Sequence, residues 1–157
     1  MRVCALALEG WRNYDAAVVD FDPGINVISG ENAQGKTNLL EAIYYLAGAR
    51  SFRTRFDREL IGFDRDAARL RAAVWSGERE QQLDILLRRG QKKLLQRNGA
   101  RASAAEMSET VRAVLFSPDD LGLIRDGAAA RRRLMDLAIC QLRPGYGKLI
   151  ADYGRVY

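Results

Sequence analysis

Histidine is absent from this 157-residue sequence, and cysteine occurs only twice. Without histidine, Ser-His-Asp and Cys-His catalysis are excluded, together with most zinc sites. Cys4 and Cys140 stand far apart, each within an apolar stretch, which is typical of buried free thiols. This cysteine usage favours a reducing compartment.

Long apolar runs are also absent. No stretch approaches the ~20 apolar residues that a membrane-spanning helix needs, and the opening MRVCALALEGW is too short for a secretory signal. We therefore expect a soluble, cytoplasmic protein that does not contact a membrane. With 48% hydrophobic residues the chain can bury one core, so intrinsic disorder is not expected.

Lysine is scarce as well. Of the 25 basic residues in this chain of net charge +5, only four are lysine, and the rest are arginine. Arginine binds phosphate through paired hydrogen bonds, so the bias suits a nucleotide or nucleic-acid partner. A GC-rich genome produces the same bias without such a partner, and composition leaves both explanations open.

Short apolar runs predict strands along much of the chain. Three of these runs lie between residues 69 and 98, bounded by Ser-Gly, Gly and Asn-Gly turn signals, which indicates an antiparallel meander. The predicted strands are VCALAL (3–8), AAVVDF (16–21), INVI (25–28), RLRAAVW (69–75), QQLDILLRR (81–89), KKLLQRN (92–98) and AVLF (113–116).

Helical spacing of apolar residues predicts four helices. The first spans 36–47, with Leu39, Leu40 and Ile43 on its apolar face and Gly48 as its C-cap. The second opens with an S-x-x-E capping box formed by Ser103 and Glu106. The other predicted helices span 128–142 and run from 146 to the last residues of the sequence.

One stretch, GENAQGKT at residues 30–37, fits the phosphate-binding pattern G-x-x-x-x-G-K-[ST]. A short apolar run precedes it and an amphipathic helix follows, which is the strand-loop-helix setting of this motif. Its two glycines let the backbone curl so that N–H groups point at a phosphate, and the start of the helix adds its positive dipole end. The stretch therefore predicts a nucleotide-binding P-loop.

Two side chains of this loop have defined tasks. Lys36 reaches the β- and γ-phosphates, and the Thr37 hydroxyl coordinates the Mg²⁺ that bridges them. Thr37 is therefore the expected metal ligand. The expected nucleotide-binding residues are Gly30, Glu31, Asn32, Ala33, Gln34, Gly35, Lys36, Thr37 and Asn38.

Hydrolysis needs further groups that the loop does not supply, namely a carboxylate on the metal and a group that orients the attacking water. Asp119 and Asp120 are the best candidates, but Ser117-Pro118 places them in a turn, and a turn that caps the next segment explains them as well. The sequence also lacks an LSGGQ-type signature, which completes an ABC-type site. We therefore assign no catalytic residue.

Beyond the P-loop motif, the sequence resembles the RecF family of bacterial DNA replication and repair proteins, whose ATPase head belongs with the ABC and SMC-type ATPases. The resemblance runs from residue 1 to the end. It is carried by WRNYDAAVVDFDPGINVISGENAQGKTNLLEAIYYL (11–46), SFRTRFDRELI (51–61), QRNGAR (96–101), VLFSPDDLGLIRDGAAARRRLMD (114–136) and YGKLIADYGRVY (146–157).

This resemblance implies an α/β P-loop NTPase head with a mixed sheet and an antiparallel meander. It implies ATP at residues 30–37 with Mg²⁺ on Thr37, and it places Arg12 and Asn13 near the nucleotide. It also implies ATP-dependent binding of gapped or single-stranded DNA in repair and replication, an ATP-dependent homodimer, and recombination-mediator proteins as partners. A solvated loop arginine is the alternative for Arg12.

Members of the family are more than twice as long as this chain. Their signature motif, their metal-binding Asp with its neighbouring catalytic Glu, and their D-loop have no match here, which leaves ATPase activity open. We therefore expect an N-terminal portion of such a protein, with an ATPase head lobe over 1–116 and the truncated start of a helical lobe over 117–157.

Two arginine-rich stretches are candidates for DNA contact. ARSFRTRFDR (49–58) interleaves four arginines with Phe52 and Phe56, a mixture that binds phosphate backbones and stacks on bases. RRR (131–133) lies at the start of a predicted helix. The alternative for the first stretch is a solvated connector whose phenylalanines pack inward, and the alternative for the second is arginines paired within the protein; both alternatives are favoured over DNA contact.

Two other function classes remain alternatives. One is a small self-contained P-loop kinase or NTPase that uses Asp119 or Asp120 on the metal. The other is a non-catalytic fragment that binds nucleotide and turns nothing over.

Overall fold

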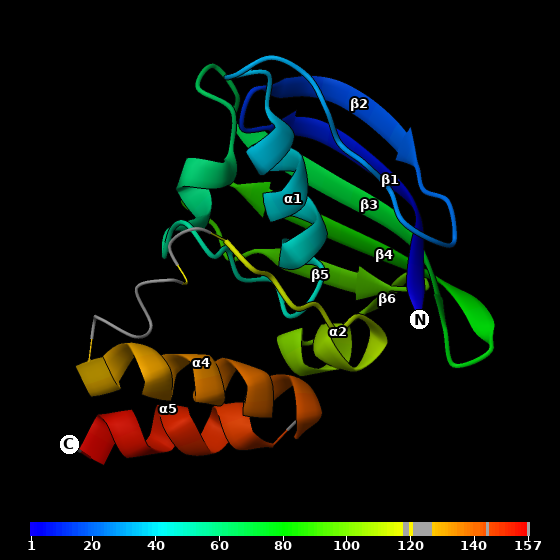
Figure 1. Cartoon of the computed structure of the whole chain (residues 1–157). Coiled ribbons are helices and arrows are strands. Elements are labelled where there is room, and N and C mark those ends of the chain that lie inside the picture. Colours follow the sequence, from blue (N-terminus) through cyan, green and yellow to red (C-terminus); the bar gives the residue numbers. More distant parts are fainter. Residues whose placement is uncertain (118–119, 121–126, 144, 157) are drawn as a thin grey trace.

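The computed structural model describes residues 1–117, 120, 127–143 and 145–156 (Figure 1). Its centre is a six-stranded sheet of order β2-β1-β3-β4-β5-β6, in which each described pair of neighbouring strands is antiparallel. The strands are β1 (Arg2–Trp11), β2 (Tyr14–Asp20), β3 (Ala67–Ser76), β4 (Arg79–Arg88), β5 (Leu94–Arg97) and β6 (Ala100–Arg101).

The helices lie in two places. Helix α1 (Lys36–Tyr45) covers one face of the sheet, and the short 3-10 helix η1 (Asp57–Leu60) lies beside it (Figure 1). Below the sheet in the same view, α2 (Ala104–Thr110) contacts α4 (Gly127–Leu142), which pairs with α5 (Tyr146–Val156).

The core lies between α1 and the covered face of the sheet. Along β3 and β4 buried residues alternate with more exposed ones, as period-two side-chain geometry requires. Leu70 of β3 stands opposite Ile85 of β4, and both are fully buried. From α1, Ala42 and Tyr45 pack into this layer, and Tyr45 meets the ring of Trp11 edge to face. Burial of this apolar layer supplies the main driving force for the fold.

The hairpin turns follow from residues that tolerate a left-handed backbone. Gly77 and Glu78 join β3 to β4 with φ of 61° and 64°, and Asn98 and Gly99 join β5 to β6 with φ of 52° and 79°. Two consecutive positive φ angles are the mark of the type I′ turn, whose twist matches that of the paired strands. The Asn-Gly signal therefore fixes the β5–β6 register locally.

A side-chain amide joins the segment after α2 to α4. Gln141 accepts a hydrogen bond from the Ala113 N–H at 2.8 Å and donates one to the Ala113 carbonyl at 3.0 Å. Between the last two helices, the Tyr146 hydroxyl donates to Asp136 at 3.0 Å. This hydrogen bond raises the pKa of Tyr146.

Most of the predicted elements are confirmed. The meander forms over β3, β4 and β5, and the capping box at α2 is present in both directions, from Glu106 N–H to Ser103 and from Ser103 N–H to Glu106. The helix predicted over 36–47 forms but ends at Tyr45, with Leu46 as its C-cap and Gly48 just beyond at φ 108°. Both cysteines are free, as predicted, but they are half-buried and not fully buried.

Two predicted strands are wrong. Residues 25–28 and 113–116 form no strand, and several of their apolar side chains face solvent: Ile25 is 93% exposed and Phe116 78% exposed. An apolar run becomes a strand only when a neighbouring strand completes its hydrogen bonds, and no described strand pairs with either segment. The parallel pairing that would make the sheet mixed is accordingly not found among the described strands.

Within the described ranges, no helix is both long and apolar enough to cross a membrane.

Candidate functional site

The glycine loop wraps the start of α1, as its sequence predicts. Gly35 is the N-cap residue, with φ 102° and ψ 5°, and it has no side chain with which to cap the helix. Within the loop, Gly30 and Ala33 also have positive φ, 149° and 65°. The first N–H groups of a helix lack intrahelical partners and carry its positive dipole end. This helix start is therefore suited to an anion.

Lys36 folds back over this loop. Its ammonium donates to the carbonyl oxygens of Gly30 at 2.8 Å and Glu31 at 2.6 Å, the first two residues of the loop. An ammonium has three donors, so these two bonds leave one for a ligand, and its positive charge lies at the helix start. Lys36 thus adds a full charge to the partial charge of the helix dipole.

The β1–β2 turn supports the loop from beneath. Gly35 has φ 102°, which strains any residue with a Cβ, and a Cβ there would lie 2.7 Å from Oδ1 of Asn13 and 3.1 Å from Cε2 of Tyr14. The Asn38 side chain donates to Asn13 at 2.7 Å, and the Tyr14 hydroxyl donates to the Gly35 carbonyl at 3.3 Å. The predicted neighbour Asn13 therefore contacts the loop directly.

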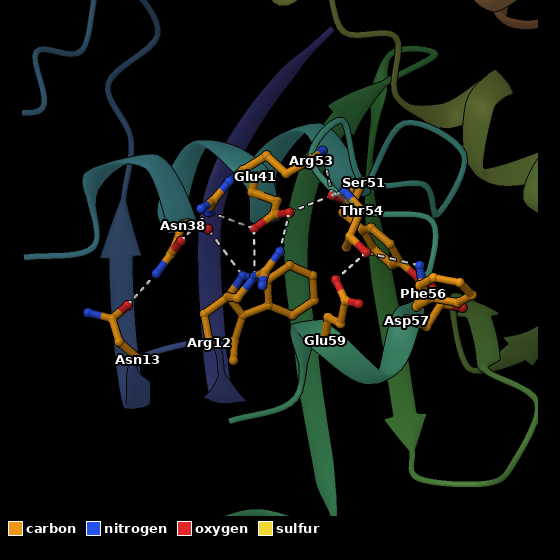
Figure 2. Close-up of polar contacts among 12 residues, drawn as sticks. Arg12, Asn13, Asn38, Glu41, Ser51, Arg53, Thr54, Phe56, Asp57 and Glu59 are labelled. Atoms are coloured by element: carbon orange, nitrogen blue, oxygen red, sulfur yellow. Dashed lines mark hydrogen bonds and ion pairs between the residues drawn. The ribbon is translucent and has the colours of Figure 1, made fainter. Parts of the chain in front are cut away.

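A buried carboxylate, Glu41, lies one turn further along α1 (Figure 2). Arg12 donates to both of its oxygens at 2.9 Å, in the bidentate geometry of a strong ion pair, and the Ser51 hydroxyl donates to it as well. Arg53 lies 3.4 Å from the same carboxylate and donates to Oδ1 of Asn38 at 2.6 Å. We call these five residues the Glu41 cluster.

The Glu41 cluster joins three segments that are distant in sequence: the β1–β2 turn, α1, and the arginine-rich linker after α1. Arg12 has φ 53°, and its side chain is only 20% exposed. It is therefore not the solvated loop arginine that its sequence position also allows. Its guanidinium is directed at Glu41, while the next residue, Asn13, contacts the loop.

A second polar group fixes the other end of α1. The Tyr45 hydroxyl donates to Asp57 at 2.7 Å, and the Lys93 ammonium lies 3.0 Å from Asp57 and donates to the Ala49 carbonyl at 2.6 Å. Burial, and then the hydrogen bond to Asp57, raise the pKa of Tyr45 well above its usual value. Tyr45 therefore stays protonated and holds η1 against α1.

A cavity of about 720 Å³ opens on the far side of the linker, between its residues and α4. Tyr44, Arg50 and Phe52 line one wall, and Arg133 and Asp136 line the other. No residue of the glycine loop contributes to it. The cavity is thus separate from the phosphate cradle.

Of the two carboxylates considered for the metal, Asp120 makes a local contact in the described part of the chain. Asp120 accepts hydrogen bonds from the Ser117 N–H at 2.6 Å and the Ser117 hydroxyl at 2.9 Å, which is a local turn contact. Asp119 lies outside the described residues. Among those described, no three His, Cys, Asp or Glu side chains are grouped so that they could hold a metal.

Sequence reasoning missed Glu41, Ser51 and Arg53. A glutamate in an amphipathic helix normally faces solvent, yet Glu41 is fully buried and the predicted face residue Leu40 is 42% exposed. The buried face of α1 is set by Leu39, Ala42 and Tyr45. Their i, i+3 spacing was a signal that could have placed Glu41 beside the core.

An antiparallel sheet covered by a helix that starts at a glycine loop, with a lysine over that loop, defines a P-loop NTPase head. Residues 5–118 match the family described as AAA domain. This chain therefore belongs to the AAA domain family.

The relatives within this class are RecF proteins. The chain is 40% identical over 156 residues to the DNA replication and repair protein RecF of Shouchella clausii (strain KSM-K16), covering 99% of this chain and 42% of that protein. A solved structure of the recombination mediator protein RecF-ATP of the RecFOR pathway has a TM-score of 0.90 and 32% identity, over 98% of this chain and 42% of that one. The resemblance to the RecF family is confirmed, and the chain spans about two-fifths of the length of these relatives.

The fold class is confirmed as well. A solved structure from work on ATP-driven dimerization and DNA stimulated activation of SMC ATPases has a TM-score of 0.71, over 87% of this chain and 98% of that chain. At 21% identity this likeness shows the shared ATPase-head fold.

Proposed function

We propose that this chain binds ATP with Mg²⁺ at its glycine loop, as the nucleotide-binding part of a DNA replication and repair protein. The observation that carries the proposal is the uncapped start of α1 at Gly35, with the Lys36 ammonium held over it. Backbone N–H groups, the helix dipole and a lysine together fit a triphosphate. The proposed ligands are residues 30–38, with Arg12 and Asn13 nearby and Thr37 on the metal.

When Mg²⁺ is bound, it neutralises charge on the β- and γ-phosphates. The residues of the chain bind the phosphates and orient the glycine loop. Asn13 and Tyr14 fix the backbone of Gly35, so that the loop is shaped before the nucleotide arrives. Preorganisation of this kind lowers the entropy that binding must offset.

Hydrolysis is not part of this proposal. Asp120 accepts a hydrogen bond from Ser117, which is a turn contact. Among the described residues, no three His, Cys, Asp or Glu side chains are grouped so that they could hold a metal. We therefore propose that the 157-residue chain binds nucleotide without turnover, and that turnover belongs to a longer protein of the RecF kind.

DNA is the proposed macromolecular partner, in gapped or single-stranded form, in the cytoplasm. Support comes from the RecF relatives, which are DNA replication and repair proteins, and from the net charge of +5. We further propose an ATP-dependent homodimer and recombination-mediator proteins as partners. The SMC structure with the same fold is described with ATP-driven dimerization. We also propose a head lobe over 1–116 and the start of a helical lobe over 117–157.

The test is isothermal titration of Mg-ATP into the 157-residue chain and into Lys36→Ala. We expect one nucleotide per wild-type chain and at least a tenfold loss of affinity in Lys36→Ala, because the charge over the cradle is gone. Lys92→Ala is the matched control, since Lys92 is an exposed lysine between β4 and β5. Equal affinity of Lys36→Ala and the wild type would overturn the assignment.

A further inference from the structure

The cavity of about 720 Å³ brings together the two arginine-rich stretches of the sequence. Arg50 and Arg55 line it from the linker after α1, and Arg133 lines it from α4. Among the described residues, none of these three arginines forms an ion pair with a carboxylate. Both walls of the cavity therefore carry positive charge that the described part of the chain leaves unpaired.

The carboxylates that also line the cavity are already engaged by other groups. They are those of Asp57, Asp120 and Asp136. Their partners, in the same order, are Lys93 at 3.0 Å, Ser117 at 2.6 Å and Tyr146 at 3.0 Å. The three arginines are thus the charged groups that this cavity offers to a ligand.

Charge from the two walls acts on one hydroxyl, that of Tyr44. Burial raises the pKa of Tyr44; Arg133 lowers this pKa, Asp120 raises it and Arg50 lowers it. Arg133 comes from α4 and Arg50 from the linker, so both guanidinium groups lie near the same part of the cavity. An anionic group beside Tyr44 is attracted by both of them.

Much of the remaining cavity lining is apolar. Leu134 and Leu137 come from α4, Ile150 comes from α5, and Leu115 comes from the segment after α2. Burial of apolar groups on this surface is favourable, whereas a small, fully charged anion gains nothing from it. A ligand that fits the cavity therefore carries apolar groups beside its negative charge.

Hydrogen bonds within the protein fix both walls. The Ser51 hydroxyl accepts from the N–H groups of Arg53 at 2.9 Å and Thr54 at 3.1 Å, which holds the linker in a turn. Gln141 of α4 bonds both the N–H and the carbonyl of Ala113, which holds the segment after α2. A preformed cavity loses less entropy on binding than one that the ligand must order.

Single-stranded nucleic acid fits this cavity less well than a peptide. Its bases stack on exposed aromatic rings along a basic groove. Phe52, which lines the cavity, packs edge to face on Tyr44 with ring centroids 5.6 Å apart, and Arg58 lies 5.0 Å from the ring centroid of Phe56. Both phenylalanines of the linker are therefore already in contact with groups of the protein.

We propose that the cavity between the linker and α4 binds an acidic peptide segment of a partner protein. Aspartate or glutamate side chains of the peptide pair with Arg50 and Arg133, and its apolar side chains pack on Leu134 and Leu137. Arginine suits this task because its guanidinium donates paired hydrogen bonds to a carboxylate. No residue of the glycine loop lines the cavity, so the proposal does not depend on nucleotide binding.

The test begins with selection of random phage-displayed peptides on the wild-type chain. The selected sequences are expected to combine acidic with apolar residues. A synthetic peptide of the consensus sequence, labelled with fluorescein, is then titrated by fluorescence anisotropy. Arg133→Glu is expected to weaken its binding about tenfold or more, because a repulsive charge replaces an attractive one.

Neighbouring residues on α4 supply the matched controls. Arg132→Glu makes the same change of charge outside the cavity, and Met135→Ser, at a side chain 55% exposed, matches Leu134→Ser, at one 48% exposed. Leu134→Ser should weaken the peptide about threefold, since a half-exposed leucine loses only part of its burial energy. Both controls should bind as the wild type does. Lys36→Ala should also bind the peptide normally, which separates this site from the proposed nucleotide site.

Equal peptide affinity of Arg133→Glu and the wild type would overturn the proposal. So would a selection that yields no consensus, or a consensus without acidic residues. Displacement of the peptide by oligothymidylate would assign the cavity to single-stranded DNA, and a dimer in sedimentation that Arg133→Glu dissociates would assign it to a second copy; either result would show the proposal to be wrong. If Arg133→Glu unfolds at a lower temperature than Arg132→Glu, Arg50→Glu applies the same test from the linker.

Discussion

The Glu41 cluster gives the sharpest prediction about stability. Glu41→Ala removes a fully buried carboxylate and leaves Arg12 without its two hydrogen bonds of 2.9 Å. Removal of one partner from a buried ion pair costs about 3–5 kcal/mol. Because the Arg12 side chain keeps 20% exposure, and Arg53 is 42% exposed and retains Asn38, both guanidinium groups regain some water. We therefore expect the lower end, about 3 kcal/mol.

The assay is urea unfolding followed by circular dichroism, with Glu41→Ala, Arg12→Ala and the double variant in one cycle. The double variant should be less destabilised than the sum of the two single variants by at least about 1.5 kcal/mol, because the second substitution removes the charge that the first left unpaired. Additive single effects, or a loss below about 1 kcal/mol in Glu41→Ala, would refute the reasoning.

The control for this cycle is a surface ion pair. Asp15 accepts from Arg65 at 2.8 Å, but their side chains are 86% and 53% exposed. Exposed pairs contribute about 0–1 kcal/mol, since water already solvates both charges. Asp15→Ala should therefore change the free energy of unfolding by less than about 1 kcal/mol, which separates the effect of burial from that of charge alone.

The remaining predictions concern the loop and α2. Gly35→Ala should abolish Mg-ATP binding, because Gly35 has φ 102° and an added Cβ would lie 2.7 Å from Asn13; Gly24→Ala, where nothing lies within 4 Å, should bind as the wild type does. The backbone N–H and then the hydroxyl of Ser103 hold the pKa of Glu106 below its usual value. That stabilisation is present above the unfolded pKa of Glu106 and is lost as pH falls through the lower folded value. An acid titration of helicity should show this loss, and Ser103→Ala should reduce it.

Local signals in the sequence suffice for much of the fold. The meander follows from period-two apolar spacing and from turns such as Asn98-Gly99, whose positive φ angles need no distant contact. The capping box at Ser103 is also local, since both of its partners lie within one helical turn. The glycine loop is local as well, because its backbone path is set by Gly30, Gly35 and the helix that follows.

Elements that depend on distant partners could not be predicted in this way. Residues 25–28 and 113–116 have strand-like composition, but a strand also needs a neighbour, and none of the described strands pairs with them. Glu41 is buried because Arg12 and Ser51, 29 and 10 residues away, satisfy its charge. The spacing of Leu39, Ala42 and Tyr45 places Glu41 beside the core, but nothing in the local sequence identifies Arg12 and Ser51 as its partners.

Binding of Mg-ATP to the purified 157-residue chain, with phosphate release measured in the presence and absence of gapped DNA, tests the central claim most directly. The account predicts saturable binding of one nucleotide per chain, lost in Lys36→Ala, with no phosphate release above the background in either condition. Absence of binding by the wild-type chain would contradict the phosphate cradle. Turnover that survives purification would contradict the proposal that this chain binds without hydrolysis.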